Sequence, residues 1–93
     1  MESSMGNMGE HQQAYMQAMT KTEDAMMRGI MAEDADVAFA CGMMGHHQAA
    51  INMANVELQV GDAGPMKEMA QKIIDAQKQE IAELRAWIEE QAQ

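Results

Sequence analysis

Apolar and polar positions alternate along most of this chain with the period of an α-helix. Between about residues 10 and 30, a set of mostly apolar side chains returns at four- or seven-residue steps, at His11, Tyr15, Met19, Met26 and Ile30. Such spacing places side chains on one face of a helix. The pattern predicts a first helix over residues 10–30. The preceding polar, Gly-containing stretch, residues 1–9, is expected to be a flexible Met-containing arm.

Two further segments show the same period and are separated by clear end signals. Asp34 suits a helix N-cap, Gly61 suits the end of a helix, and Pro65 suits the first turn of the next one. The stripe of the second helix comprises Asp36, Ala40, Met43, His47, Ala50, Ala54 and Leu58. That of the third comprises Met66, Met69, Ala70, Ile73, Gln77, Ile81, Leu84, Trp87 and Ile88. The pattern predicts an all-α domain over residues 10–93, an antiparallel helical bundle of three main helices.

Short connections between antiparallel helices allow residues on neighbouring helices to be matched by counting from each turn at about 1.5 Å per residue. The expected neighbours are Met16 and Met19 beside residues 46–49, Met26 beside Phe39, Glu80 and Ile81 beside His46, and Leu84 beside Met43. Gly42 and Gly45 fall inside the second helix, where each glycine costs roughly 1 kcal/mol relative to alanine. We therefore expect another backbone or a ligand to approach the helix closely there.

The composition limits the classes of protein to which the chain can belong. With 93 residues it forms one domain, and with 13 Met but only 3% aromatic residues its interior must be built largely from Ala and flexible thioethers. The formal net charge of -9 argues against a nucleic-acid surface and favours cations. No apolar run is long enough to predict a membrane span. Cys41 is the single cysteine, so no disulfide forms within the chain; we expect a small packing residue or a dimer contact.

Soft-metal ligands gather in the second helix, in the segment CGMMGHHQAAINMA over residues 41–54. Thioether sulfur selects Cu(I), or its chemical relative Ag(I), and imidazole accepts copper in either oxidation state. Met43 precedes His46 by three residues and His47 by four, and so reaches the same side of the helix as either ring. These three residues form the predicted principal copper site. Secondary candidates are Met44, Met19, Met16 and Met53, and weaker sites are expected at the M-x-x-M pairs Met5 with Met8, Met16 with Met19, and Met66 with Met69.

Two other interpretations compete with copper binding. Stacked Met residues at helical spacing serve more often as core than as ligands, so the chain also fits a metal-free helical module whose Met-rich faces bind partner helices. A ferritin-like di-iron oxidase would need Glu-x-x-His motifs that project into the bundle, and the sequence contains none. We therefore predict a binding protein rather than an enzyme.

The segment DADVAFACGMMGHHQAAINMA, residues 34–54, followed by GDAGPMKEMAQKIIDAQKQEIAELRAW, residues 61–87, resembles the domain-of-unknown-function 305 family. The residues that carry the resemblance are Asp36, Phe39, Met43, His46, His47, Ala50, Ile51, Met53, Ala54, Pro65, Ile73, Ile74, Gln77, Glu80, Ile81 and Trp87. The resemblance implies a ferritin-like helical bundle, usually exported to the bacterial periplasm or cell surface. It also implies binding of copper or silver through Met and His, with a role in metal resistance. On this basis we expect a periplasmic protein that sequesters Cu(I) or Ag(I), or hands it to a metal-delivery or efflux protein.

Two features depart from that family pattern. Leu84 occupies a position where the family commonly has Met, so one expected sulfur near Met43 is missing, and Met44 stands where the family usually has an aliphatic residue. A ferritin-like bundle needs four long helices, whereas three are predicted here. Because so small a core is marginal, we expect a homodimer to complete the bundle.

Overall fold

The computed structural model describes residues 9–91 and contains three α-helices there: α1 Glu10–Gly29, α2 Ala35–Val60 and α3 Gly64–Gln91. These helices confirm the all-α prediction. The expected arm, residues 1–9, lies outside the described residues except for Gly9. Within residues 9–91, no helix has both the length and the apolar character that crossing a membrane requires.

Both ends of α2 follow the signals in the sequence. The Asp34 carboxylate accepts a hydrogen bond from the backbone N–H of Val37 at 3.0 Å, which satisfies one of the N–H groups that a helix start leaves free. At the other end, the N–H of Gly61 donates to the carbonyl of Glu57 at 2.8 Å. Pro65 is the second residue of α3, where a missing N–H removes no helical hydrogen bond. The predicted start and end of α2 are therefore confirmed.

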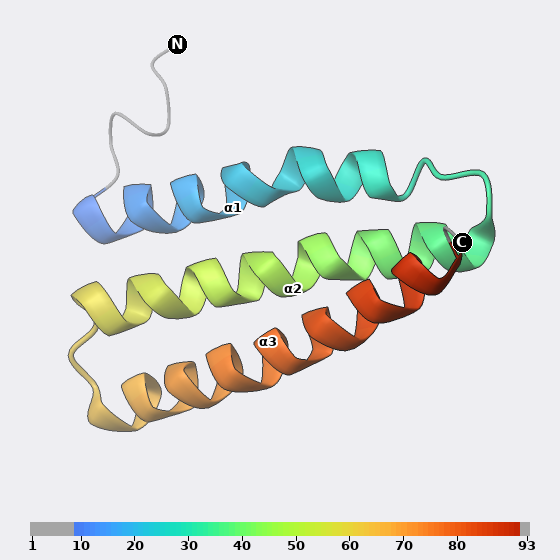
Figure 1. Ribbon diagram of the computed structural model, residues 1–93. Coiled ribbons are helices and arrows are strands. Elements are labelled where there is room, and N and C mark those ends of the chain that lie inside the picture. Colours follow the sequence, from blue (N-terminus) through green and yellow to red (C-terminus); the bar gives the residue numbers. More distant parts are fainter. Residues whose placement is uncertain (1–8, 92–93) are drawn as a thin grey trace, which may run out of the picture.

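The three helices lie side by side in one layer with α2 in the middle (Figure 1). The chain reverses at each connection, and the layer measures 46 × 38 × 14 Å. Since a helix with its side chains is about 10–12 Å across, the smallest dimension corresponds to a single helix. α1 and α3 each pack along α2 and barely meet each other. The described part of the chain is therefore an open layer, and no fourth helix closes it into a bundle.

Apolar side chains that interlock between the helices form the α2–α3 interface. The buried cluster consists of Ile51, Ala54, Ala70 and Ile74, with Leu58 and Ile81 packed against it. These residues lie on or beside the predicted stripes of the two helices, so the periodicity correctly identified the contact faces. His47, also in its predicted stripe, is only 7% exposed. The apolar driving force for folding is concentrated at this interface.

Close approach of backbones forms the α1–α2 interface. A Cβ atom on Gly45 would lie 3.0 Å from the Cα of Met26, and one on Gly29 would lie 2.9 Å from the backbone carbon of Cys41. A Cβ on Gly42 would come within 2.7 Å of the Ile30 side chain. Gly45 therefore lets the backbone of α1 approach, which was one of the two predicted reasons for these glycines, whereas Gly42 makes room for the Ile30 side chain.

The predicted register between α2 and α3 is confirmed to within one residue. The Nε2 atom of His47 lies 2.8 Å from the Oε1 atom of Glu80. Counting from the connection had placed Glu80 beside the preceding residue, His46. Leu84 and Met43 line the same hollow, as expected for neighbours. A connection of only three residues, 61–63, joins these helices and leaves little room for one to slide along the other.

The predicted register between α1 and α2 is wrong by more than one helical turn. Met26 lies against Gly45, six residues further along α2 than the predicted neighbour Phe39. The reason is that α1 ends against Cys41, since Gly29 contacts the backbone of that residue. The first turn and a half of α2 therefore extends past the end of α1, and the counting from the connection did not include this overhang.

Candidate functional site

Two hollows lie along the α2–α3 interface on one face of the layer. The larger, here called the His47 hollow, has a volume of about 610 Å³, and its lining includes Asp36, Phe39, Met43, His47, Glu80 and Leu84. The smaller, here called the Met53 hollow, has a volume of about 290 Å³, and its lining includes Tyr15, Met53, Glu57, Met66, Met69 and Ile73.

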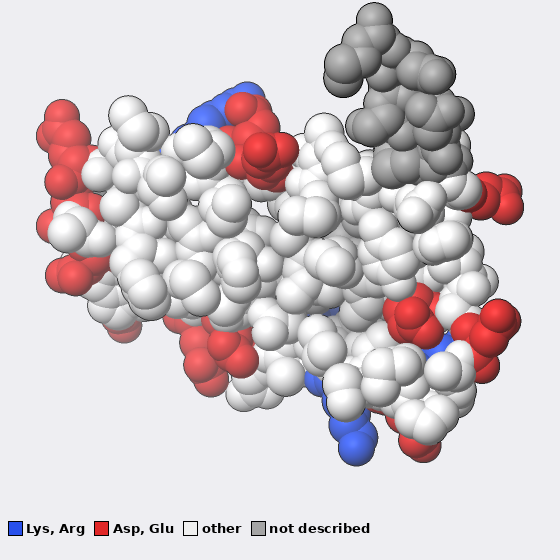
Figure 2. Space-filling view, turned by 180° about the vertical axis from the view of Figure 1, so that it is seen from behind, with Lys and Arg blue, Asp and Glu red and all other residues white. Residues whose placement is uncertain are grey.

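The two hollows share a face because their lining residues recur along α2 at helical spacing. Positions 39, 43, 50, 53 and 57 line one or the other, and steps of three, four or seven residues keep them on one side of the helix. Figure 2 shows this side, which is turned away from the viewer in Figure 1. Its middle consists mostly of uncharged side chains, and Asp and Glu gather toward the edges (Figure 2). A largely apolar, Met-bearing face thus surrounds both hollows.

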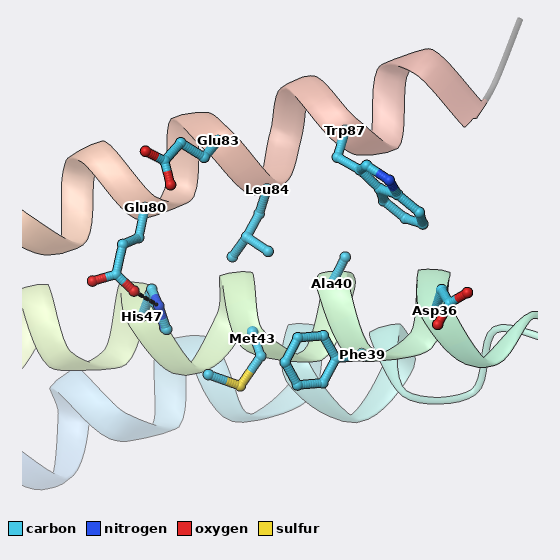
Figure 3. A pocket seen from close by; sticks show the side chains of 9 residues that line it. All are labelled: Asp36, Phe39, Ala40, Met43, His47, Glu80, Glu83, Leu84 and Trp87. Carbon is cyan, nitrogen blue, oxygen red and sulfur yellow. Dashed lines mark hydrogen bonds and ion pairs between the residues drawn. The ribbon is translucent and has the colours of Figure 1, made fainter.

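His47 is the best-positioned candidate ligand in the larger hollow. It is 7% exposed, and its Nε2 atom pairs with the Oε1 atom of Glu80 at 2.8 Å (Figure 3). A carboxylate can only accept, so with Glu80 ionised the Nε2 atom of His47 carries the proton and donates it. The lone pair of the neutral ring is then on Nδ1. A carboxylate that fixes the tautomer in this way is a common partner of metal-binding histidines.

The Nδ1 atom of His47 is buried and has no hydrogen-bond partner among the described residues. A buried polar atom without a partner costs about 1–3 kcal/mol, so such an atom calls for a structural or functional reason. Here the atom is a nitrogen lone pair in a ring that lines a hollow. The lone pair of this nitrogen is covered in the structure, so an ion in the hollow would reach it after a local shift of the ring or of the side chains around it.

Met43 of α2 and Leu84 of α3 both line the His47 hollow; Leu84 points toward α2, whereas the Met43 side chain extends away from α3 (Figure 3). Met43 lies one turn of α2 before His47, so its sulfur and the imidazole serve the same hollow. Leu84 stands at the position where the resemblance noted from the sequence led us to expect a sulfur, and it lines the same hollow as Met43. Among the residues that line this hollow, Met43 is the one that carries a thioether.

His46 lies outside the His47 hollow and is exposed. The two ring centroids are 6.1 Å apart with an angle of 60° between the planes. Along α2, His46 stands between Met43 of the larger hollow and Ala50 of the smaller one, and so lies between the two hollows on the open face. Of the adjacent histidines, only His47 lines a hollow.

The secondary candidates do not gather around His47. Met44 is half-buried and lines neither hollow, because one step of about 100° along the helix separates it from Met43. Met16 and Met19 are 44% and 49% exposed. The Asn52 side chain donates to the carbonyl of Ala18 at 3.3 Å, so this part of α1 lies beyond the predicted level of residues 46–49.

Met53 belongs to the other hollow, together with Met66 and Met69 of α3. The sequence analysis treated Met53 as a secondary ligand of the histidine site and Met66 with Met69 as a separate pair. Their convergence was missed, although counting outward from the short connection at residues 61–63 gives a signal for it. Beside them, the hydroxyl of Tyr15 donates to the Glu57 carboxylate at 3.1 Å. Burial, and then the hydrogen bond and charge of Glu57, raise the pKa of Tyr15.

No group of three or more His, Cys, Asp or Glu side chains is arranged to hold a metal ion within residues 9–91. Cys41 is half-buried, and its backbone packs against Gly29 at the α1–α2 interface. Cys41 therefore packs against α1, but it is not the fully buried small residue that the sequence led us to expect.

Comparison with known proteins gives one family. No curated protein matches the chain. The sequence model of one family, described as domain of unknown function (DUF305), matches residues 1–88. The match is longer than the resemblance noted over residues 34–87, because it also takes in α1. It spans nearly the whole chain, and the protein therefore belongs to the DUF305 family.

Proposed function

We propose that this protein binds Cu(I), or the chemically related Ag(I), and either sequesters the ion or hands it on without chemical turnover. The observation that carries the proposal is the buried, unpartnered Nδ1 atom of His47, in a ring held by Glu80 and placed one turn from Met43. The metal is cargo, and the protein supplies its ligands.

The ligand chemistry supports a soft monovalent ion. Met43 supplies a neutral thioether and His47 a neutral imidazole, a combination that suits Cu(I) better than Mg²⁺ or Ca²⁺, which prefer oxygen. His46 on the open face provides a third donor next to them. The net charge of -9 adds a long-range attraction for cations.

Glu80 acts in this proposal as a positioning residue. Its carboxylate holds the Nε2–H group of His47 and leaves Nδ1 for the metal. Loss of such a partner typically weakens metal affinity about 10- to 100-fold. The side chain of Glu80 is half exposed, so it can adjust when an ion binds.

A second copy of the chain is the partner that we propose for the open face. The layer is one helix thick, and its 46 × 38 Å face exceeds the roughly 800 Å² per partner of a standard stable interface. Two such layers packed face to face would build the ferritin-like bundle that the family resemblance implies, and would bring a second set of Met ligands to the hollows. Sedimentation equilibrium tests this association, and a monomer at every concentration would contradict it.

The cellular role that we propose rests on the family resemblance. It is copper or silver homeostasis or resistance in the periplasm or another exported location, with a metal-delivery or efflux protein as exchange partner. The chemistry of the hollow supports only the binding step.

The test is a competitive titration of the reduced protein with Cu(I) against a chromogenic chelator. His47→Ala should weaken binding at least tenfold, because it removes the ligand that Glu80 positions. His11→Ala on α1 is the matched control and should have no effect. Glu80→Leu should weaken binding about 10- to 100-fold, and Glu80→Gln, which still accepts from Nε2–H, should retain most of it. Leu84→Met should strengthen binding by adding a sulfur to the same hollow. Equal affinities for wild type and His47→Ala would refute the proposal.

A metal-free interaction module is the second candidate function. It is favoured by the exposure of Met16, Met19, Met53, Met66 and Met69, each at least 40% exposed. Flexible thioethers suit surfaces that adapt to partner helices. Partner binding that is unaffected by copper chelators and by His47→Ala would support this function instead.

A further inference from the structure

The Met53 hollow has three methionines among its lining residues, whereas the His47 hollow has one, Met43. Met53 reaches it from α2, and Met66 and Met69 reach it from α3. Met66 and Met69 are three residues apart on one helix, a spacing that places both side chains on the same side. Three thioethers from two helices thus meet around a space of about 290 Å³.

The backbone beneath these sulfurs is fixed by the core. Met53 directly precedes Ala54 and Met69 directly precedes Ala70, and both alanines belong to the buried cluster of the α2–α3 interface. The backbone positions of Met53 and Met69 are therefore held in place relative to each other by the core. Small residues at these core positions also let the two helices lie close together.

The three methionines contribute little to packing. They are 40%, 47% and 52% exposed, whereas apolar residues that serve a core are mostly buried. Met has three rotatable bonds and can turn its sulfur inward at low cost. Exposed, flexible thioethers over a rigid base are suited to closing around a small ligand.

The lining has no His or Cys among its members, so nitrogen and thiolate ligation are absent from this hollow. Thioethers alone select soft, weakly hydrated ions such as Cu(I) and Ag(I) and bind Zn²⁺ or Mg²⁺ poorly. One carboxylate, Glu57, also lines the hollow and offsets part of the charge of a monovalent cation.

We propose that Met53, Met66 and Met69 form a second site, which binds one Cu(I) or Ag(I) ion through three thioether sulfurs. The choice of ion rests on the proposed function, but the site uses none of the residues of the His47 hollow. No redox step is involved, since the ion enters and leaves in the +1 state. The chain would then offer two kinds of site, one with nitrogen and sulfur and one with sulfur alone.

The experiment uses the full chain with ¹³C-labelled methionine methyl groups and Ag(I), which is diamagnetic. It starts from the His46→Ala/His47→Ala variant, so that the histidine site cannot bind. The methyl resonances of Met53, Met66 and Met69 should shift together and saturate at one equivalent. Met69→Leu, which nearly preserves volume, should weaken this binding at least tenfold and reduce the shifts of the other two. Met31→Leu is the matched control, because Met31 is 78% exposed and lines neither hollow, and it should have no effect.

The possible outcomes separate this inference from the proposed function. Independent shifts of the three methyl groups, or unchanged binding in Met69→Leu, would overturn the three-sulfur site. Circular dichroism of each variant checks that the helices persist. If His47→Ala leaves the Cu(I) affinity of the whole protein unchanged but the three methyl groups still shift together, the histidine site fails and the sulfur site stands.

Discussion

The two interfaces of α2 are built on different physical principles. On the α3 side, aliphatic side chains around Ile51 and Ile74 fill the space between the helices and bury apolar surface. On the α1 side, glycines at positions 29 and 45 let the backbones come close, and the buried α1 residues are the small Ala18 and Thr22. One interface is held mainly by side-chain burial, and the other mainly by close backbone contact and hydrogen bonds.

This difference explains where the candidate sites lie. Interlocking side chains keep α2 and α3 far enough apart for hollows to open along their edge, and both hollows are on that interface. A hollow of about 320 Å³ also lies between α1 and α2, but its lining consists mainly of polar groups such as Gln17, Asn52 and Gln59. The α2–α3 interface therefore combines the core of the domain with its candidate ligands.

The largest effect is expected from Ile74→Ala, which removes part of the α2–α3 core. Ile74 is 5% exposed, and truncation of such a residue typically costs about 2–5 kcal/mol. Ile73 is the matched control, because it is next in sequence but 37% exposed, and Ile73→Ala should cost clearly less. Urea unfolding of both variants measures the difference. Equal losses would mean that the cluster does not dominate stability and that the contrast between the two interfaces is wrong.

A smaller loss is expected from Gly45→Ala at the α1–α2 interface. The added Cβ would lie 2.9–3.1 Å from the Cβ, Cα and N atoms of Met26, so α1 must move away. Alanine gains roughly 1 kcal/mol of helix propensity over glycine, which offsets part of an overpacking cost of about 1–3 kcal/mol. We therefore expect a net loss of about 0–2 kcal/mol in the free energy of unfolding, measured by thermal denaturation.

Gly64→Ala provides the control for this substitution. Nothing lies within 4 Å of a Cβ at that position, so the change should be neutral or slightly stabilising. If Gly45→Ala also stabilised the protein, the close approach of α1 would not restrict position 45, and the interface would have to be looser than described.

The sequence allowed one interface to be predicted better than the other, for reasons that these glycines illustrate. Between α2 and α3, the Gly61 end signal and Pro65 limit the connection to three residues, so counting gave the pairing of Leu84 with Met43 and nearly that of Glu80 with His47. Between α1 and α2 the connection is five residues, 30–34, and the level is set by which backbone fits over Gly42 and Gly45. Counting along a helix carries no information about that fit.

The candidate sites were likewise predictable only in part. The spacing of Met43 and His47 on one helix was sufficient to place them together. The hydrogen bond from His47 to Glu80 could not be predicted in the same way, because it depends on the rotamer of a long side chain on another helix. The separation of His46 from the hollow follows from the 100° step between neighbouring helix residues, which weakens any argument based on an adjacent His-His pair alone.

The smallest effect is expected at Tyr15, whose side chain joins α1 to α2 through its hydrogen bond to Glu57. Burial, followed by the hydrogen bond and the charge of Glu57, raises the pKa of Tyr15 above its ordinary value. A raised folded-state pKa adds stability that is fully present below the unfolded pKa and is lost as the pH rises through the folded pKa. The α1–α2 interface should therefore weaken above about pH 10.

Tyr15→Phe isolates this contribution. The variant should lose about 0.5–1.5 kcal/mol or less near neutral pH, since one partly exposed hydrogen bond disappears, and it should show a shallower decline in melting temperature between neutral and alkaline pH than the wild type. Because Tyr15 is the only tyrosine, the absorbance of tyrosinate reports its ionisation directly in the folded wild-type protein. A tyrosinate titration at or below pH 10 would contradict the buried contact with Glu57. It would also show that, near Tyr15, α1 is held by the glycine contacts without the help of this hydrogen bond.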